Sequence, residues 1–145
     1  MLKVSFYILP GNEESNFLNY SCRLIEKVFL AEHKILVLCE NPEQAKEVNH
    51  LLWSFKIDSF IPHVIDYELD KDNTLKELPV LISSNMSYYN GQDVIISLAR
   101  ESIEPLNACK KLLYIVNQNE VRLKSSRMLY RFYQNMHYDI IIHKI

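Results

Sequence analysis

The spacing of apolar residues changes several times along the chain and predicts alternating strands and helices. An apolar run over 4–9 predicts a first strand, and the continuous run 34–39 predicts a strand covered on both faces, as in a parallel sheet. Between them, small or apolar residues recur at three- and four-residue spacing from Leu18 to Phe29, which predicts a helix with one buried face. The order strand, helix, strand predicts a βαβ unit.

Asparagine residues stand where the predicted helices begin. Asn41 suits the cap of a second helix, with Pro42 at its first position and Gln44 at the capping-box position. Asn12 is expected to cap the first helix, and residues 117–120 are expected to form the cap of the last one, with Glu120 at its third helical position. Because helices and strands alternate, the sequence favours an α/β layered fold.

The second half of the chain continues this alternation after one less regular stretch. Acidic residues are frequent in 60–78, including Asp70 and Asp72, and we interpret this stretch as a mostly exposed connection. A last helix is predicted to end near Met136. Strands are predicted over 79–82, 93–98, 112–116 and 138–143.

Composition limits the classes of protein that this chain can represent. Its 145 residues suggest a single domain over 1–145, and a formal net charge of −2 argues against general nucleic-acid binding. The three cysteines, Cys22, Cys39 and Cys109, are odd in number and far apart, so we expect buried free thiols in a reducing cytoplasm and no metal site. No apolar run is long enough for a membrane span.

Motifs for common catalytic chemistry are missing from the sequence. With only Gly11 and Gly91, neither a dinucleotide-binding nor a P-loop glycine pattern can be formed. The histidines do not form an HExxH pair, and no serine lies in GxSxG. His63 is the one histidine considered for catalysis, and a packed or hydrogen-bonded structural role is the more common case. The sequence therefore predicts a chain without cofactor, metal or catalytic residue.

A basic stripe in the last predicted helix is the first candidate binding feature. Lys124, Arg127 and Arg131 share one helical face, and Tyr130 flanks them. No acidic residue occurs between Val121 and Met136. Two interpretations remain open: basic residues that complement the helix dipole on a solvated face, or a site for an acidic peptide with an apolar anchor.

The second candidate feature is a dense group of large apolar side chains over 51–63. One helical face cannot bury Leu51, Leu52, Trp53 and Phe55 together. Trp53 and Phe60 then either close the core or form a contact surface for a partner, since aromatic residues are favoured interface anchors.

A series of short motifs gives the chain a family resemblance. The motifs, in chain order, are Phe6-Tyr7-Ile8-Leu9, 37–41 with 43–45, Leu52-Trp53, Ser59-Phe60-Ile61-Pro62-His63, 79–82, 93–98, and Arg127 with 130–133. With these motifs in this order, the sequence resembles the chi subunits of bacterial DNA polymerase III over nearly its whole length.

The resemblance implies a fold, a role and partners. The fold would be a single-domain, Rossmann-like α/β structure, with a parallel or mixed sheet, helices on both faces and no bound nucleotide. The chain would be non-catalytic and cytoplasmic. It would join the clamp loader through the psi subunit and bind the acidic C-terminal tail of the single-stranded-DNA-binding protein. Single-stranded DNA would be met only indirectly, through that protein.

The resemblance also assigns residues. Trp53 and Phe60 correspond to the psi contact. Arg127 and Arg131 are assigned to the carboxylates of the tail. The apolar end of the tail is assigned to Val116 and Tyr130.

Three positions depart from the family pattern. Leu123 stands where the family has a basic residue, with Lys124 next to it as a candidate substitute. His137 stands where the family usually has a glycine, which serves as a left-handed cap after the last helix. Ser97 stands where Asn is common.

Two other functions remain as alternatives. A direct single-strand binder would use the basic residues of the last helix with Tyr130, Phe132 and Tyr133 as stacking groups. A degenerate nucleotide hydrolase is suggested only by the alternation of strands and helices, which cannot by itself establish function.

Overall fold

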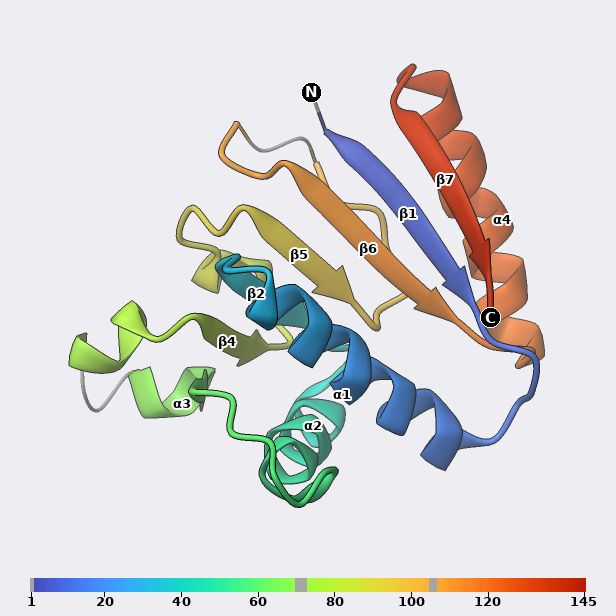
Figure 1. Cartoon of the computed structure of the whole chain (residues 1–145). Coiled ribbons are helices and arrows are strands. Elements are labelled where there is room, and N and C mark those ends of the chain that lie inside the picture. Colours follow the sequence, from blue (N-terminus) through green and yellow to red (C-terminus); the bar gives the residue numbers. More distant parts are fainter. Residues whose placement is uncertain (1, 70–72, 105–106) are drawn as a thin grey trace.

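The structure, a computed structural model, describes residues 2–69, 73–104 and 107–145. Its strands form one sheet in the order β3-β4-β2-β5-β6-β1-β7, and every recorded strand pair is parallel. Figure 1 shows the sheet running from the β4 side across to β7. The strands are β1 (Lys3–Ile8), β2 (Ile35–Leu38), β3 (His63–Ile65), β4 (Val80–Ser83), β5 (Val94–Ser97), β6 (Lys111–Val116) and β7 (Asp139–Lys144).

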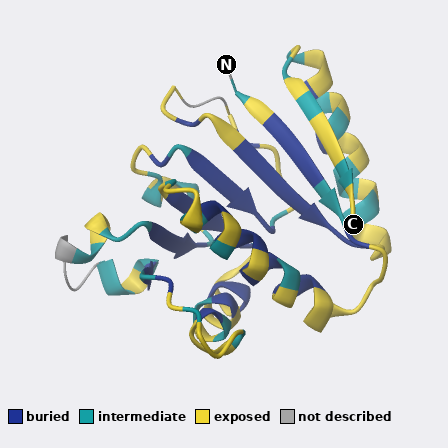
Figure 2. Ribbon diagram, in the orientation of Figure 1, coloured by how far each residue is buried: buried dark blue, intermediate teal, exposed yellow. Residues whose placement is uncertain are grey.

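Helices lie on both faces of this sheet, which confirms the predicted α/β class (Figure 1). Buried residues of α1 and α2 pack in one apolar cluster, and buried residues of α4 pack in a second cluster on the opposite face. Figure 2 shows the central strands buried and the outer helix faces exposed. The helices are α1 (Glu14–Leu30), α2 (Pro42–Ser54), α3 (Asp66–Leu69) and α4 (Glu120–Asn135), with 3₁₀ turns η1 (Asn73–Glu77) and η2 (Met86–Tyr88).

The beginning of α2 follows the predicted capping pattern. The Asn41 side chain accepts a hydrogen bond from the Gln44 backbone N–H at 2.8 Å, and the Gln44 side chain accepts one from the Glu40 backbone N–H at 2.7 Å. Pro42 occupies the first helical position, where its missing N–H costs nothing. These local contacts fix the entry into α2.

The other two predicted helix starts need correction. The cap of α1 is Glu13, with no side-chain capping bond, and not Asn12. The cap of α4 is Asn119, whose side chain accepts from the backbone N–H groups of Val121 and Arg122. Glu120 is consequently the first residue of α4, where the helix dipole favours its negative charge.

The interpretation of 60–78 as mostly exposed connection is wrong for its first half. His63–Ile65 forms the buried strand β3, which pairs in parallel with β4. A strand of three residues is too short to show an alternating pattern, and Pro62 and Asp66 beside it are residue types common in loops. The strand therefore forms because it pairs with β4, not because of a local sequence signal. Asp70 and Asp72, on which the acidic reading also relied, lie outside the described residues.

The prediction of buried free thiols is confirmed. Cys22, Cys39 and Cys109 are free and buried. Burial raises the pKa of the Cys22 thiol to about 12 and that of Cys109 to about 11, so both remain protonated and unreactive near neutral pH.

Two departures from the family pattern have visible structural settings. His137 has a φ of 61°, so this histidine occupies the left-handed conformation that glycine adopts most easily. Ser97 is buried at the end of β5, and its hydroxyl accepts a hydrogen bond from the Ala99 backbone N–H at 3.2 Å. Both substitutions are accommodated without a break in the sheet.

Two further features bear on function. Nowhere in the described ranges do three or more His, Cys, Asp or Glu side chains gather closely enough to hold a metal ion. None of the helices in that part of the chain combines the length and apolar character needed to cross a bilayer.

Candidate protein-interaction surfaces

The cationic stripe of α4, defined as Lys124, Arg127 and Arg131, is exposed along its length. Within the described residues, the stripe forms no ion pair with an Asp or Glu side chain. Positions three and seven residues apart lie on the same side of a helix. The structure therefore presents three unneutralised cations together on a protein whose net charge is negative.

An apolar row lies beside this stripe. Leu123 and Tyr130 are seven residues apart, hence nearly aligned along the helix, and both are half-buried against the cluster beneath α4. The Tyr130 ring is tilted against Phe6 of β1, with 6.3 Å between centroids. Tyr130 is thus held by the sheet on one side and partly open to solvent on the other.

The helix geometry places Lys124 relative to Leu123, the position where the family resemblance implies a basic residue. Consecutive residues of an α-helix point about 100° apart, so Lys124 is turned away from the row of Leu123 and Tyr130. Lys124 instead aligns with Arg131, seven positions later, and Arg127 lies between the two rows. Lys124 adds charge to the stripe but points to a different side of the helix from Leu123.

Two residues near the stripe differ from the simplest sequence-based picture. Val116 is only 4% exposed, so its side chain belongs to the core beneath α4 and offers little contact area. The charge of Arg122 is neutralised by Glu14, to which Arg122 donates two hydrogen bonds at 2.8 and 3.0 Å. Its guanidinium also lies 3.7 Å from the ring centroid of Phe17, which is a cation–π contact.

The aromatic patch, defined as Trp53 and Phe60, lies at the end of α2 and before β3. Trp53 is 56% exposed and Phe60 is 68% exposed, so neither side chain closes the core. Their ring centroids are 6.0 Å apart, and the neighbouring Ile57 is fully exposed. Large apolar groups gathered in solvent mark an interaction surface more often than isolated ones do.

His63 supports this patch, which the sequence did not indicate. The buried His63 ring lies 4.4 Å from the Trp53 ring, and its nitrogens are within hydrogen-bond distance of the Ile61 and Asn49 carbonyl oxygens, at 2.6 and 3.1 Å. The expectation of a packed, hydrogen-bonded histidine is therefore confirmed. The only available signal was its position three residues after Phe60.

The two surfaces lie at opposite ends of the sheet. The aromatic patch adjoins β3, which is one edge strand, whereas α4 packs on β6 and β7, and β7 is the other edge strand. Figure 1 shows α4 and β7 on the far side of the sheet from α2 and α3. The cationic stripe and the aromatic patch therefore do not overlap.

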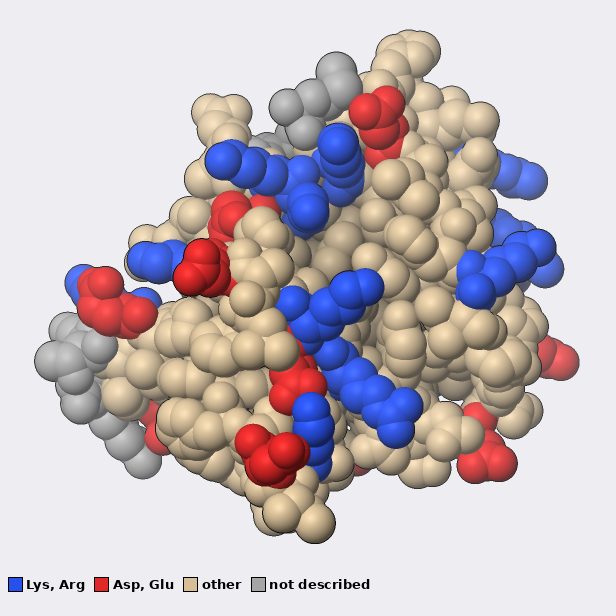
Figure 3. All heavy atoms as spheres, in the orientation of Figure 1, with Lys and Arg blue, Asp and Glu red and all other residues tan. Residues whose placement is uncertain are grey.

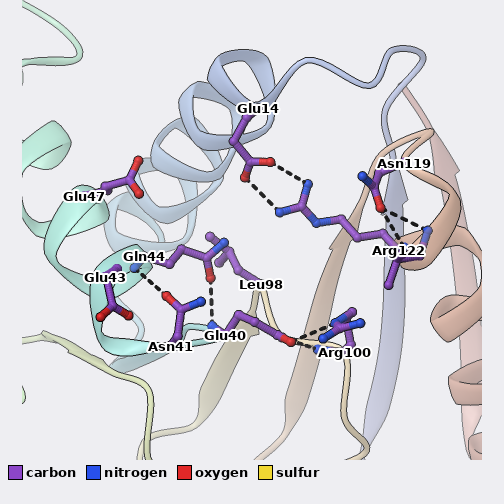
Figure 4. Close-up of a pocket in the computed structure, with 11 residues that line it drawn as sticks. Glu14, Glu40, Asn41, Glu43, Gln44, Glu47, Leu98, Arg100, Asn119 and Arg122 are labelled. Carbon is purple, nitrogen blue, oxygen red and sulfur yellow. Dashed lines mark hydrogen bonds and ion pairs between the residues drawn. The ribbon is translucent and has the colours of Figure 1, made fainter.

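Rossmann-like folds bind nucleotides at the carboxyl ends of their strands. In this protein the pocket at that end is rich in glutamates. A cavity of about 460 Å³ lies where the first turns of α1, α2 and α4 meet (Figure 4). Its charged lining includes Glu14, which pairs with Arg122, and Glu40, which pairs with Arg100 at 2.7 Å. Glu43 and Glu47 add two further carboxylate groups.

This pocket is unsuited to phosphate groups. Helix N-termini normally attract anions through their free N–H groups and dipoles. Here Glu14 and Glu43 already place negative charge in the first turns, and both arginines that line the cavity pair with glutamates. The geometry therefore argues against the nucleotide-hydrolase alternative.

Comparison with solved structures agrees with the fold class. The C-terminal domain of the DEAD-box protein Dbp5 superposes with a TM-score of 0.67 at 7% identity, over 97% of this chain and 90% of that one. T4 UvsW gives a TM-score of 0.70 at 7% identity, over 99% of this chain and 41% of that one. At such low identity these similarities show a Rossmann-like α/β fold alone.

Sequence relationships identify the family within that class. The family model of the DNA polymerase III chi subunit matches residues 1–140, so the chain belongs to this family of replicase subunits. It is 27% identical over 145 residues to a DNA polymerase III subunit chi of Pseudomonas aeruginosa, covering 100% of this chain and 98% of that one. A Haemophilus influenzae DNA polymerase III subunit chi is 25% identical over 126 residues, covering 87% and 85%.

Proposed function

We propose that this chain is a non-catalytic adaptor of the bacterial replicase. The cationic stripe of α4 would bind the acidic C-terminal tail of the single-stranded-DNA-binding protein, and the aromatic patch would bind the psi subunit of the clamp loader. The chain would act in the cytoplasm and meet single-stranded DNA only through the coating protein. The observation that carries the proposal is the cationic stripe beside the half-exposed Tyr130, without ion pairs among the described residues.

The cationic stripe and the apolar row would bind different parts of the tail. Arg127 and Arg131 would donate hydrogen bonds to carboxylates, each contributing roughly 1.5–3 kcal/mol. The apolar end would lie on Leu123 and Tyr130, with Val116 supporting them from the core rather than touching the ligand. Because ordering the tail costs several kcal/mol, we expect a micromolar, salt-sensitive contact.

Titration of a labelled tail peptide tests this assignment. We expect Arg127→Ala and Arg131→Ala each to weaken binding about tenfold or more, since a charge-assisted contact is lost. Arg23→Ala, an exposed arginine of α1, is the matched control and should bind like the parent. Parental affinity in both stripe variants would refute the assignment.

The direct single-strand binder has less structural support. Tyr133 is fully buried, and its hydroxyl accepts a hydrogen bond from the Ile103 N–H at 2.7 Å, so this ring cannot stack on a base. Tyr130 already leans on Phe6. Saturable binding of a bare oligonucleotide at physiological salt, without the coating protein, would restore this alternative.

A further inference from the structure

One face of the β6–β1–β7 part of the sheet is left partly open. There α4 covers one face, whereas α1 only borders the other, and a depression of about 350 Å³ remains between α1 and the strands. Its apolar lining comes from Tyr7, Leu113 and Ile141 on the strands and from Leu24 and Val28 on α1. We call this depression the α1 trough.

Lysines surround the α1 trough. Lys3, Lys27 and Lys111 are exposed and line it, and none of them pairs with an acidic side chain among the described residues. Its lining contains no Asp or Glu, although Asp139 begins β7 in register with Lys3. Figure 3 shows Lys and Arg side chains on both sides of a hollow on this face of the molecule.

The fold places two of these lysines at neighbouring backbone positions. Lys3 and Lys111 are register partners on neighbouring parallel strands, and alternate residues of both strands point into the trough. Like charges at paired strand positions are destabilising. An anion bound between them would remove that cost, whereas an uncharged apolar ligand would not.

The aromatic groups at the trough favour an acidic peptide over a nucleic acid as the anionic ligand. One face of the Tyr7 ring stacks on His143, with centroids 4.4 Å apart and 12° between the planes, and Tyr20 lies against it at 6.3 Å. With His143 stacked on one face and Tyr20 tilted against the ring, Tyr7 is poorly placed to stack on a nucleic-acid base. The rest of the lining is largely aliphatic, which suits an inserted apolar side chain of a peptide.

We infer that the α1 trough is a second peptide-binding site, which takes an internal acidic segment carrying one large apolar side chain. The apolar side chain enters against Tyr7 and Ile141, the two more exposed large apolar groups of the lining, and flanking carboxylates meet Lys27 and the pair of Lys3 and Lys111. Neighbouring β1 residues serve opposite faces, since Phe6 faces α4 and Tyr7 faces the trough. The inference therefore does not depend on the tail-binding function proposed for α4.

A blocked peptide separates this site from the α4 stripe. The probe is a fluorescein-labelled peptide with two aspartates on each side of one phenylalanine and an amidated C-terminus. It is titrated into full-length protein that carries Arg127→Ala and Arg131→Ala, so that the α4 stripe is disabled. We expect saturable binding that weakens about tenfold or more when Lys27→Glu and Lys111→Glu are added, because attraction becomes repulsion at two contacts.

Matched variants and a competing ligand complete the test. Lys46→Glu, on an exposed part of α2, makes the same charge change outside the trough and should leave affinity unchanged. Ile141→Ala should weaken the phenylalanine peptide but not a version with alanine in its place. Equal binding by the lysine variants and the parent would overturn the inference. So would tighter, lysine-dependent binding of an oligothymidine, or lysine-dependent self-association without peptide.

Discussion

The two edges of the sheet carry surfaces of opposite chemistry. At the β3 edge, Trp53 and Phe60 expose large rings, and the buried His63 supports Trp53 from below. At the β7 edge, α4 exposes Arg127 and Arg131 beside a smaller apolar row. The first surface relies on removing apolar area from water, and the second relies on charge.

This difference determines how each contact responds to conditions. Salt weakens attraction between exposed charges, with a screening length of roughly 8–10 Å near physiological ionic strength, but leaves apolar burial almost unchanged. A preformed aromatic patch suits a long-lived partner, whereas a cationic stripe suits a partner that must be exchanged. The adaptor would then stay with the clamp loader while it releases and recaptures coated template.

The largest effect should come from the aromatic patch. Trp53→Ala is expected to weaken binding of a psi subunit about 30-fold or more, because central aromatic anchors contribute roughly 2–4 kcal/mol or more. The loss should be nearly equal at low and at moderate salt. Isothermal titration with purified psi measures it.

The matched control for Trp53 is Leu30→Ala. Leu30 is 69% exposed at the end of α1, away from the patch, so removing it deletes a comparable apolar group and should not alter psi binding. Tail-peptide affinity should be parental in both variants. A Trp53→Ala protein that binds psi as tightly as the parent would show that the patch serves another purpose.

The second effect is a change in tail-peptide affinity caused by substitutions in α4. Leu123→Lys should strengthen tail binding about three- to tenfold at low salt, because the cation restored in the row of Tyr130 contributes more than the apolar contact that Leu123 loses. Lys124→Ala should weaken binding less than Arg127→Ala does, since Lys124 points away from that row. Fluorescence anisotropy at two salt concentrations measures both. A larger loss from Lys124→Ala than from Arg127→Ala would show that Lys124 had taken over the missing role.

The third effect concerns the end of α4 and changes stability, not binding. His137 occupies a left-handed conformation, which costs a non-glycine residue roughly 1–2 kcal/mol. Glycine adopts this conformation without strain, but it also makes the unfolded chain more flexible, which offsets part of the gain. His137→Gly should therefore raise the free energy of unfolding by about 0.5–1 kcal/mol. Urea unfolding measures the change. His137→Ala keeps the strain and should show no such gain.

How much of this could be predicted depends on the range of the interactions. The run 34–39 and the Asn41 cap are local patterns, and both are confirmed. The neutralisation of Arg122 could not be predicted, because Glu14 is 108 positions away in sequence. Strand β3 was missed because its identity comes from pairing with β4 and not from its own short sequence.

The candidate surfaces divide in the same way. The i, i+3, i+7 spacing in the sequence suffices to place the three cations of α4 together, and helix geometry alone separates Lys124 from Tyr130. The α1 trough had no sequence signal, because Lys3 and Lys111 become neighbours only when β1 and β6 pair. The family resemblance supplied partners for the edges of the sheet but could not supply a site on its open face.

The smallest effect tests a charged contact that should affect neither surface. Asp93 accepts hydrogen bonds from the Lys34 backbone N–H at 2.8 Å and from the His33 ring, whose nitrogen is 2.6 Å away. Burial tends to raise the pKa of this carboxyl, but the hydrogen bonds from His33 and Lys34 outweigh burial, and the pKa of Asp93 is lowered. A carboxyl whose pKa is lower in the folded protein than in the unfolded chain stabilises the fold at pH values above the unfolded-state pKa. That stabilisation is lost as the pH falls through the folded-state pKa.

Because Asp93 and His33 are partly exposed, we expect the free energy of unfolding to fall by only a few tenths of a kcal/mol on acidification. In Asp93→Asn this pH-dependent decrease should be absent when urea unfolding is measured at a series of acidic pH values. Psi and tail affinities at neutral pH should match the parent in this variant, and a change in either would mean that the amino-terminal end of the sheet is coupled to its edges.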